Sequence, residues 1–195
     1  MTPKKTVAAK PKRRSPITRE EGEKRLINAT LDLLRERPFS EVGVRDIAAR
    51  ADVNHGFVHT WFGSKNDLLK RVALGLVTAL VDKVENAPEG TPALQPFDED
   101  VKLLIQLVTW LKLENADLRD VMMNRHVIAA FARRYEQVEG MRPDVAHVAA
   151  QQIVAIGAAA VAFGDIIDVT SNQDFINMMG QWRHIVGLLA KHPPA

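Results

Sequence analysis

The chain has 195 residues, of which 46% are hydrophobic and 26% are charged, and it includes 11 glycines and 10 prolines. This apolar content is enough for one large or two small packed domains, and it excludes a disordered, collagenous or low-complexity protein. The chain has no cysteine, which excludes disulfide frameworks, thiolate zinc sites and cysteine nucleophiles.

Charge is divided unevenly along the chain. Residues 1–75 carry 16 Lys and Arg against 9 Asp and Glu, whereas residues 76–195 carry 10 against 15. The basic part is therefore a candidate for contact with a polyanion. Residues 1–16 are rich in Lys, Arg, Pro and Ala, and we expect a disordered basic arm there. The arm lacks the apolar run of a secretory signal, so we expect a cytoplasmic protein.

The fold class predicted from the sequence is all-α, because apolar residues recur at intervals of three and four and no alternating runs indicate strands. Thr18 and Glu21 form a capping-box pattern that predicts the start of a first helix, and Pro38 ends it. A second short helix follows over 44–51. After the turn at 51–54, a third short helix is expected over 55–61, with Asn54 as its N-cap.

A longer fourth helix is expected to start at Ser64, whose spacing to Asp67 is again that of a capping box, and to end before the proline-rich segment 86–96. Further helices are predicted over 98–114, 117–137, 143–168 and 173–191. Residues 145–164 carry no formal charge and are long enough to span a bilayer. Eight of them are alanine, so a helix buried in protein is favoured over a membrane span.

Two short helices joined by a tight turn, in the basic part of the chain, are typical of a helix-turn-helix DNA-binding domain. Val58 is expected to pack inward with Val44, Ile47, Val53 and Phe62. A helical wheel centred on Val58 places Gly56 and Thr60 on the opposite face, where they are available to enter a major groove.

Several motifs with fixed spacing resemble the N-terminal signature of the tetracycline-repressor (TetR) family of bacterial transcription regulators: Val44-Arg45-Asp46-Ile47-Ala48, Ala51-Asp52-Val53, Trp61-Phe62-Gly63-Ser64-Lys65 and Asp67-Leu68-Leu69. The resemblance covers roughly residues 18–76. It implies a helix-turn-helix DNA-binding domain over 17–65 and a C-terminal helical bundle over 66–195 for dimerisation and ligand binding. The chain departs from the family pattern at Gly43, Asp52 and His59.

The resemblance also implies roles for individual residues. Arg45 could reach a base edge or a nearby phosphate, and its side chain suits guanine. His55, Gly56 and Phe57 would face base edges, where Phe57 suits a thymine methyl group. The DNA backbone would be contacted by the side chains of His59, Thr60, Trp61 and Lys65.

Each of these roles has a plainer alternative. His55 and His59 have the spacing of a metal pair, but Gly56 stands where the zinc-peptidase pattern needs glutamate, so no metal site is expected. Phe57 and Trp61 could instead be packing residues, and the basic arm could be a solubilising tail.

The C-terminal helices predict a partner and a ligand. The last helix has a narrow apolar seam through Phe175, Met178 or Met179, and Trp182, and we expect a homodimer built from the last two helices. Bulky, adaptable side chains on the middle helices predict a site for a small apolar effector, a role that the resemblance also implies; the candidate ligand-binding residues are Trp110, Met122, Met123, His126 and Phe131.

The sequence thus predicts a DNA-binding transcriptional regulator, most simply a repressor that binds an inverted-repeat operator and is released by the effector. No catalytic residues and no cofactor are predicted. One alternative is an architectural DNA-binding protein without an effector. A second is a small all-helical enzyme or metalloprotein, for which His147, Asp165 and Asp168 would have to meet in the fold.

Overall fold

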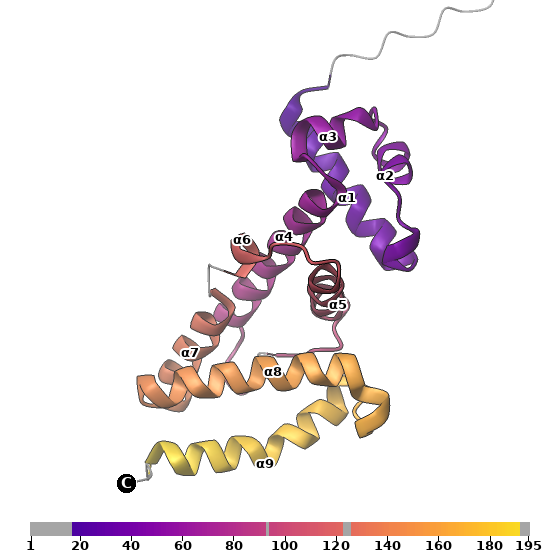
Figure 1. Cartoon of the computed structure of the whole chain (residues 1–195). Helices are drawn as coiled ribbons and strands as arrows, with labels where there is room; N and C mark the ends of the chain where they lie inside the picture. Colours follow the sequence, from indigo (N-terminus) through magenta and orange to yellow (C-terminus); the bar gives the residue numbers. More distant parts are fainter. Residues whose placement is uncertain (1–16, 93, 123–125, 192–195) are drawn as a thin grey trace, which may run out of the picture.

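The computed structural model describes residues 17–92, 94–122 and 126–191. Within these ranges the chain is helical and contains no strand, as the all-α prediction required. The elements, in chain order (Figure 1), are α1 (Arg19–Glu36), η1 (Phe39–Glu41), α2 (Val44–Ala51), α3 (Gly56–Phe62), α4 (Lys65–Glu85), α5 (Glu99–Leu113), α6 (Arg119–Met122), α7 (His126–Glu139), α8 (Pro143–Ile167) and α9 (Asn172–Lys191). The proposed basic arm, 1–16, lies outside the described residues.

The molecule has two ends joined by one long helix. Helices α1, α2 and α3 gather at one end, α8 and α9 lie side by side at the other, and α4 runs from the first group toward the second (Figure 1). Helix α5 packs along α4 and also contacts α8. Helix α4 packs against α1 and α3 near its start and against α7, which in turn packs on α8.

Side chains at the helix starts confirm most of the predicted caps. Thr18 accepts the Glu21 N–H at 3.2 Å, although the Glu21 carboxylate accepts from Arg25 at 2.8 Å and does not complete the predicted capping box. Ser64 accepts the Asp67 N–H at 3.1 Å at the start of α4. Each cap satisfies one of the backbone donors that the first turn of a helix leaves without a partner.

The turn between α2 and α3 is tight because one residue adopts a left-handed conformation. Asp52 has φ 55° and ψ 44°, a region that aspartate tolerates better than most residues. The Asn54 side chain then accepts the Gly56 N–H at 2.8 Å. The turn and this cap fix where α3 begins relative to α2.

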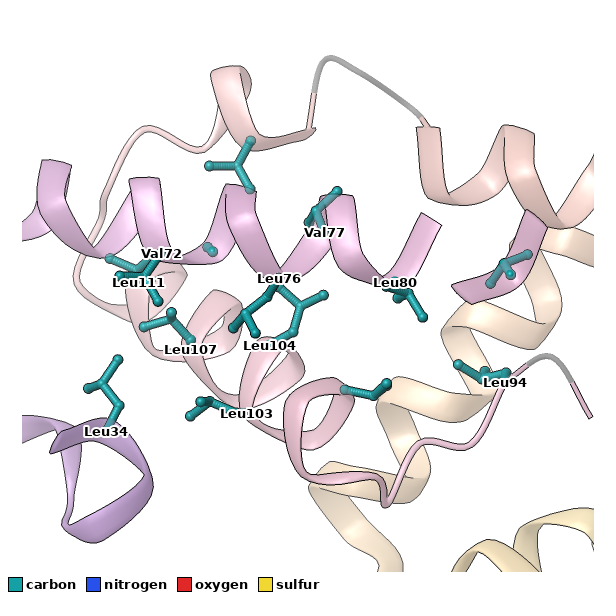
Figure 2. Packing of buried hydrophobic residues seen from close by; sticks show 14 of the residues in the cluster. Leu34, Val72, Leu76, Val77, Leu80, Leu94, Leu103, Leu104, Leu107 and Leu111 are labelled. Atoms are coloured by element: carbon teal, nitrogen blue, oxygen red, sulfur yellow. The ribbon is translucent and has the colours of Figure 1, made fainter. Parts of the chain in front are cut away.

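One part of the hydrophobic core lies between α4 and α5. Leucine and valine side chains of α4 meet those of α5 across the interface (Figure 2). Leu34 of α1 faces α5 (Figure 2). Leu107 and Leu111 are completely buried. Helix α5 therefore contacts the N-terminal group directly as well as through α4.

The described part of the region predicted as one helix over 117–137 holds two helical segments, α6 and α7. Residues 123–125 between them lie outside the described residues, so the predicted continuity of this helix stays a prediction.

Helix α8 is long and apolar enough to cross a membrane, although it belongs to a helical bundle here. Pro143 occupies its first turn, and at Phe163 the backbone leaves helical geometry. A third of its most apolar stretch is buried, against α7, α5 and α9. Helix α9 starts where Ser171 accepts the Asp174 N–H at 3.2 Å.

Helix α5 offers a matched pair of leucines for testing this core. Leu107 is 0% exposed and Leu113 is 76% exposed. We predict that Leu107→Ala lowers the free energy of unfolding by about 2–5 kcal/mol, because it removes buried methyl groups and leaves a cavity. Leu113→Ala should change the same free energy by less than about 0.5 kcal/mol. Urea denaturation followed by circular dichroism measures both, and equal losses would contradict the described packing.

Candidate functional site

The burial of one side chain fixes the orientation of α3. Val58 and Ile47 are both 0% exposed and join the core, with Val44, Val53 and Phe62 packed around them. This is the small shared core predicted from the sequence. Because α3 has only seven residues, burying Val58 leaves the opposite face outside.

The outer face of α3 carries the predicted groove-facing positions. Thr60 is exposed and donates its hydroxyl hydrogen to the Gly56 carbonyl at 3.1 Å, and Gly56 is half-buried with no side chain to cover the backbone. His55 and His59 are exposed at the two ends of this face. The surface is small, polar and open, as entry into a major groove requires.

Two arginines of α2 have different surroundings. Arg50 is held in place by Glu36, with two hydrogen bonds of 2.8 and 2.7 Å. Arg45 is exposed at the start of the helix, and none of the described carboxylates pairs with it. An arginine whose N–H groups donate to no carboxylate within the protein is available for bidentate contact with a base or a phosphate.

Phe57 and Trp61 form one aromatic stack. Their rings are nearly parallel, with centroids 4.2 Å apart and an interplanar angle of 6°. The Trp61 ring also lies against Gly22 of α1, so closely that a Cβ added at Gly22 would come within 2.4 Å of it. Both aromatic side chains remain half-buried. The stack therefore positions α3 on α1, and the part of each ring left exposed borders the outer face.

The histidine pair shows no sign of a metal site. The His59 Nδ1 atom lies 3.3 Å from the Gly63 carbonyl oxygen, within its own helix end. Among the described residues no group of three or more His, Asp or Glu side chains gathers around a possible ion position.

Lys65 lies differently from its predicted role at the DNA backbone. Its ammonium donates to the Phe39 carbonyl at 3.3 Å and lies 5.4 Å from the centroid of the Trp110 ring. Burial lowers the pKa of Lys65, and the carboxylate of Glu114 opposes that shift. In this conformation the ammonium faces η1 and α5.

An apolar cavity of about 330 Å³ lies between α4, α5, α7 and α8. Of the described residues that line it, only Thr109 has a polar side chain, and its hydroxyl already donates to the Ile105 carbonyl at 2.8 Å. Helix α5 contributes Val101, Leu104 and Val108 to the wall. Such a lining favours an uncharged ligand, because an ion would lose its hydration without gaining a partner.

Only one of the predicted ligand-binding residues lines this cavity in the described structure. Phe131 lies in its wall. Trp110 does not: its ring packs edge-on against Phe39 at 6.3 Å, on the opposite side of α5, and we correct that prediction. The side chains of Met122 and His126, and the whole of Met123, lie outside the described residues.

The exposed face of α8 is apolar along much of its length. Val148, Phe163 and Ile166 are 50%, 57% and 80% exposed. Between them Gln151, Gln152, Ala155, Ala159 and Ala162 are also exposed, and the helix kinks at Phe163. Exposed apolar residues gathered in this way are typical of a surface that another protein covers.

Only part of the apolar seam predicted on α9 is exposed for contact with a second copy of the chain. Phe175 and Met179 are 2% and 5% exposed, so they pack inside the chain, whereas Met178 is 37% exposed on the outside. Trp182 lies against Tyr135, with ring centroids 6.5 Å apart. The prediction could not separate Met178 from Met179, because both fit the spacing.

Contacts between the N-terminal helices and α5 were missed by the sequence analysis. Arg35 of α1 pairs with Glu99 at 3.1 Å and with Asp100 at 2.5 Å, both at the start of α5, and Phe39 and Lys65 meet Trp110 near its end. These partners are 45 to 71 residues apart in the sequence. No local spacing rule relates such positions, and only the fold brings them together.

Comparison with known proteins agrees with this geometry. Residues 26–72 match the family model described as bacterial regulatory proteins, tetR family. The matched range contains all of α2 and α3, including every residue placed above on the outer face of α3.

Curated relatives carry the same description. The chain is 29% identical over 151 residues to the HTH-type transcriptional repressor Rv3405c of Mycobacterium tuberculosis, covering 75% of this chain and 78% of the relative. It is 30% identical over 121 residues to the HTH-type transcriptional regulator BetI of Klebsiella pneumoniae, covering 56% of this chain and 60% of that protein. Both relatives are named as regulators of transcription.

Solved structures show the same fold. The TetR family repressor AlkX from Dietzia, implicated in biodegradation of n-alkanes, has a TM-score of 0.52 and 17% identity, covering 87% of this chain and 95% of its own. A putative transcriptional regulator from Pseudomonas aeruginosa PAO1 has a TM-score of 0.53 and 16% identity, covering 88% and 93%. The similarity extends over the C-terminal helices as well as the region that the family model matches.

Proposed function

We propose that this chain, which is similar to the TetR family of bacterial regulatory proteins over residues 26–72 and to curated transcriptional regulators, is a cytoplasmic DNA-binding repressor. In this proposal it binds an inverted-repeat operator as a homodimer and is released by a small apolar effector. The proposal assigns DNA binding to residues 17–65, and dimerisation and effector binding to 66–195. Its main support is the outer face of α3 beside unpaired Arg45, inside the matched region.

In the proposed DNA complex, α3 enters the major groove with its exposed face. Gly56 lets the backbone approach the bases, while Phe57 and His55 reach base edges near the start of the helix. Arg45 supplies base recognition from α2. His59, Thr60 and the exposed edge of Trp61 lie toward the phosphates, and Lys65 joins them if its ammonium leaves Trp110.

The proposed dimer uses the exposed stripe of α8 together with the outer side of α9. Two copies related by a two-fold axis would bury the stripe against itself, since a two-fold interface uses the same patch on both partners. The exposed alanines allow the two helix backbones to approach closely. Two α3 helices related in this way call for two half-sites in inverted orientation.

The apolar cavity is the proposed effector site. It borders α4, which begins beside α3, and α5, which contacts α1. A ligand that changes the separation of these helices has a direct mechanical route to the DNA-binding residues. The lining described above supports an uncharged apolar molecule as the effector.

The base-reading role of Arg45 can be separated from general electrostatics. We predict that Arg45→Ala weakens operator binding by about 1–3 kcal/mol and relaxes base preference, with a smaller effect on random DNA. Arg50→Ala is the matched control, because Arg50 lies on the same helix and is held by Glu36. Selection of binding sites from random DNA, followed by titration of the selected duplex, measures both. An equal loss on selected and random DNA would argue against a base contact by Arg45.

The dimer can be tested with two exposed residues of similar size. Ile166 is 80% exposed on the α8 stripe, and Leu113 is 76% exposed at the end of α5. We predict that Ile166→Asp gives monomers, because it buries an unpaired carboxylate at the interface, and that Leu113→Asp leaves dimers. Analytical ultracentrifugation gives the mass of each variant. A monomeric wild-type protein, or a dimeric Ile166→Asp variant, would overturn this interface.

The cavity can be tested with a neutral fluorescent probe. N-phenyl-1-naphthylamine should bind the wild-type protein with enhanced emission, and Val108→Phe should reduce that binding at least tenfold by filling the space. Leu113→Phe, on the same helix outside the cavity, should leave probe binding unchanged. If Val108→Phe binds the probe normally, the probe and the proposed effector site do not coincide.

A further inference from the structure

The Lys65 ammonium is held by two groups from different parts of the fold. The Phe39 carbonyl accepts from it at 3.3 Å, and the Trp110 ring of α5 lies 5.4 Å away, within the range of a cation–π contact. Phe39 also packs edge-on against Trp110, at an interplanar angle of 88°. The ring is thereby held in one orientation, with Lys65 over it.

The same ammonium belongs to a residue beside the proposed DNA surface. Lys65 is the first residue of α4, and only Gly63 and Ser64 separate it from the end of α3. A lysine ammonium is a compact charge on a flexible stem, so it can turn from one partner to another. An ammonium that turns toward a DNA phosphate beside α3 would leave the ring face of Trp110.

We propose that Trp110 competes with a DNA phosphate for the Lys65 ammonium, so that helix α5 restrains one of the contacts between this regulator and DNA. The inference rests on the proposed function, because it takes Lys65 to be a phosphate contact in the complex. It makes Trp110 a positioning residue that acts through Lys65, with no contact to DNA of its own.

Helix α5 lines the apolar cavity on one side and carries Trp110 on the other, so it connects the cavity to the Lys65 contact. Val101, Leu104 and Val108 face the cavity, while Trp110 lies on the other side of the helix toward η1 and α4. A molecule that shifts α5 would therefore alter the distance between Trp110 and Lys65. The carboxylate of Glu114, at the end of α5, also attracts the ammonium and adds to the restraint.

A double-mutant cycle on random-sequence duplex DNA tests the competition without knowledge of the operator. Binding is followed by fluorescence anisotropy over a range of salt concentrations. Lys65→Met should reduce the slope of log Kobs against log salt by about 0.9, the loss of one phosphate contact. Trp110→Leu should tighten binding by about 2- to 30-fold, as expected when a cation–π competitor is removed. In the Lys65→Met background, Trp110→Leu should give no tightening.

Two further variants guard against an effect of packing. Trp110→Phe keeps a smaller ring over Lys65 and should give a smaller gain than Trp110→Leu, which also keeps the test available if the leucine variant unfolds. Trp182→Leu, a half-buried tryptophan on α9, should give no gain.

The outcomes distinguish two failures. Suppose that Lys65→Met reduces the salt slope. If Trp110→Leu then leaves DNA binding unchanged or weakens it, or if it tightens binding equally in the Lys65→Met background, the proposed competition is wrong. The phosphate contact of Lys65 would still stand. If Lys65→Met leaves the slope unchanged, Lys65 does not contact DNA, and both that part of the proposed function and this inference fall.

Discussion

The burial of Val58 is the constraint on which the DNA-binding surface depends. In a helix as short as α3, one completely buried side chain determines the rotation of all the others. The left-handed turn at Asp52 and the cap at Asn54 determine where the helix starts, and the stack of Trp61 against Gly22 fixes it on α1. These contacts are made within the domain, either by apolar side chains or by neighbouring residues in the turn. The exposed polar residues of α3 can therefore vary without loss of the fold.

A second constraint connects this surface to the rest of the molecule. Helix α5 lies between the apolar cavity and the N-terminal helices, with Arg35 paired to its first turn and Trp110 in contact with Lys65 near its last. The buried face of α5 is close-packed, and close-packed interiors transmit displacement. The cavity and the Lys65 side chain, one of the proposed DNA contacts, thus lie on opposite sides of α5.

The sequence predicted well what depends on local pattern. Caps at Thr18 and Ser64, the bounds of most helices and the inward orientation of Val58 all follow from spacing within a few residues. Contacts that depend on distant packing could not be foreseen in this way. Trp110 was assigned to the ligand site because it is large and apolar, but its partner Phe39 is 71 residues away. Lys65 was assigned to the DNA backbone by its position in a motif, and the contact with α5 that holds it here has no local signature.

The exposed alanines of α8 have a consequence for the length of the operator. Helices that meet through small side chains lie at the short end of the usual 8–10 Å separation, and larger side chains push them apart. In the proposed dimer, the small size of Ala155 and Ala159 would therefore set the separation of the two α8 helices. That separation in turn would set the distance between the two copies of α3. Major grooves on one side of a duplex recur about every 34 Å, so residues remote from the nucleic acid would decide which half-site separations the protein accepts.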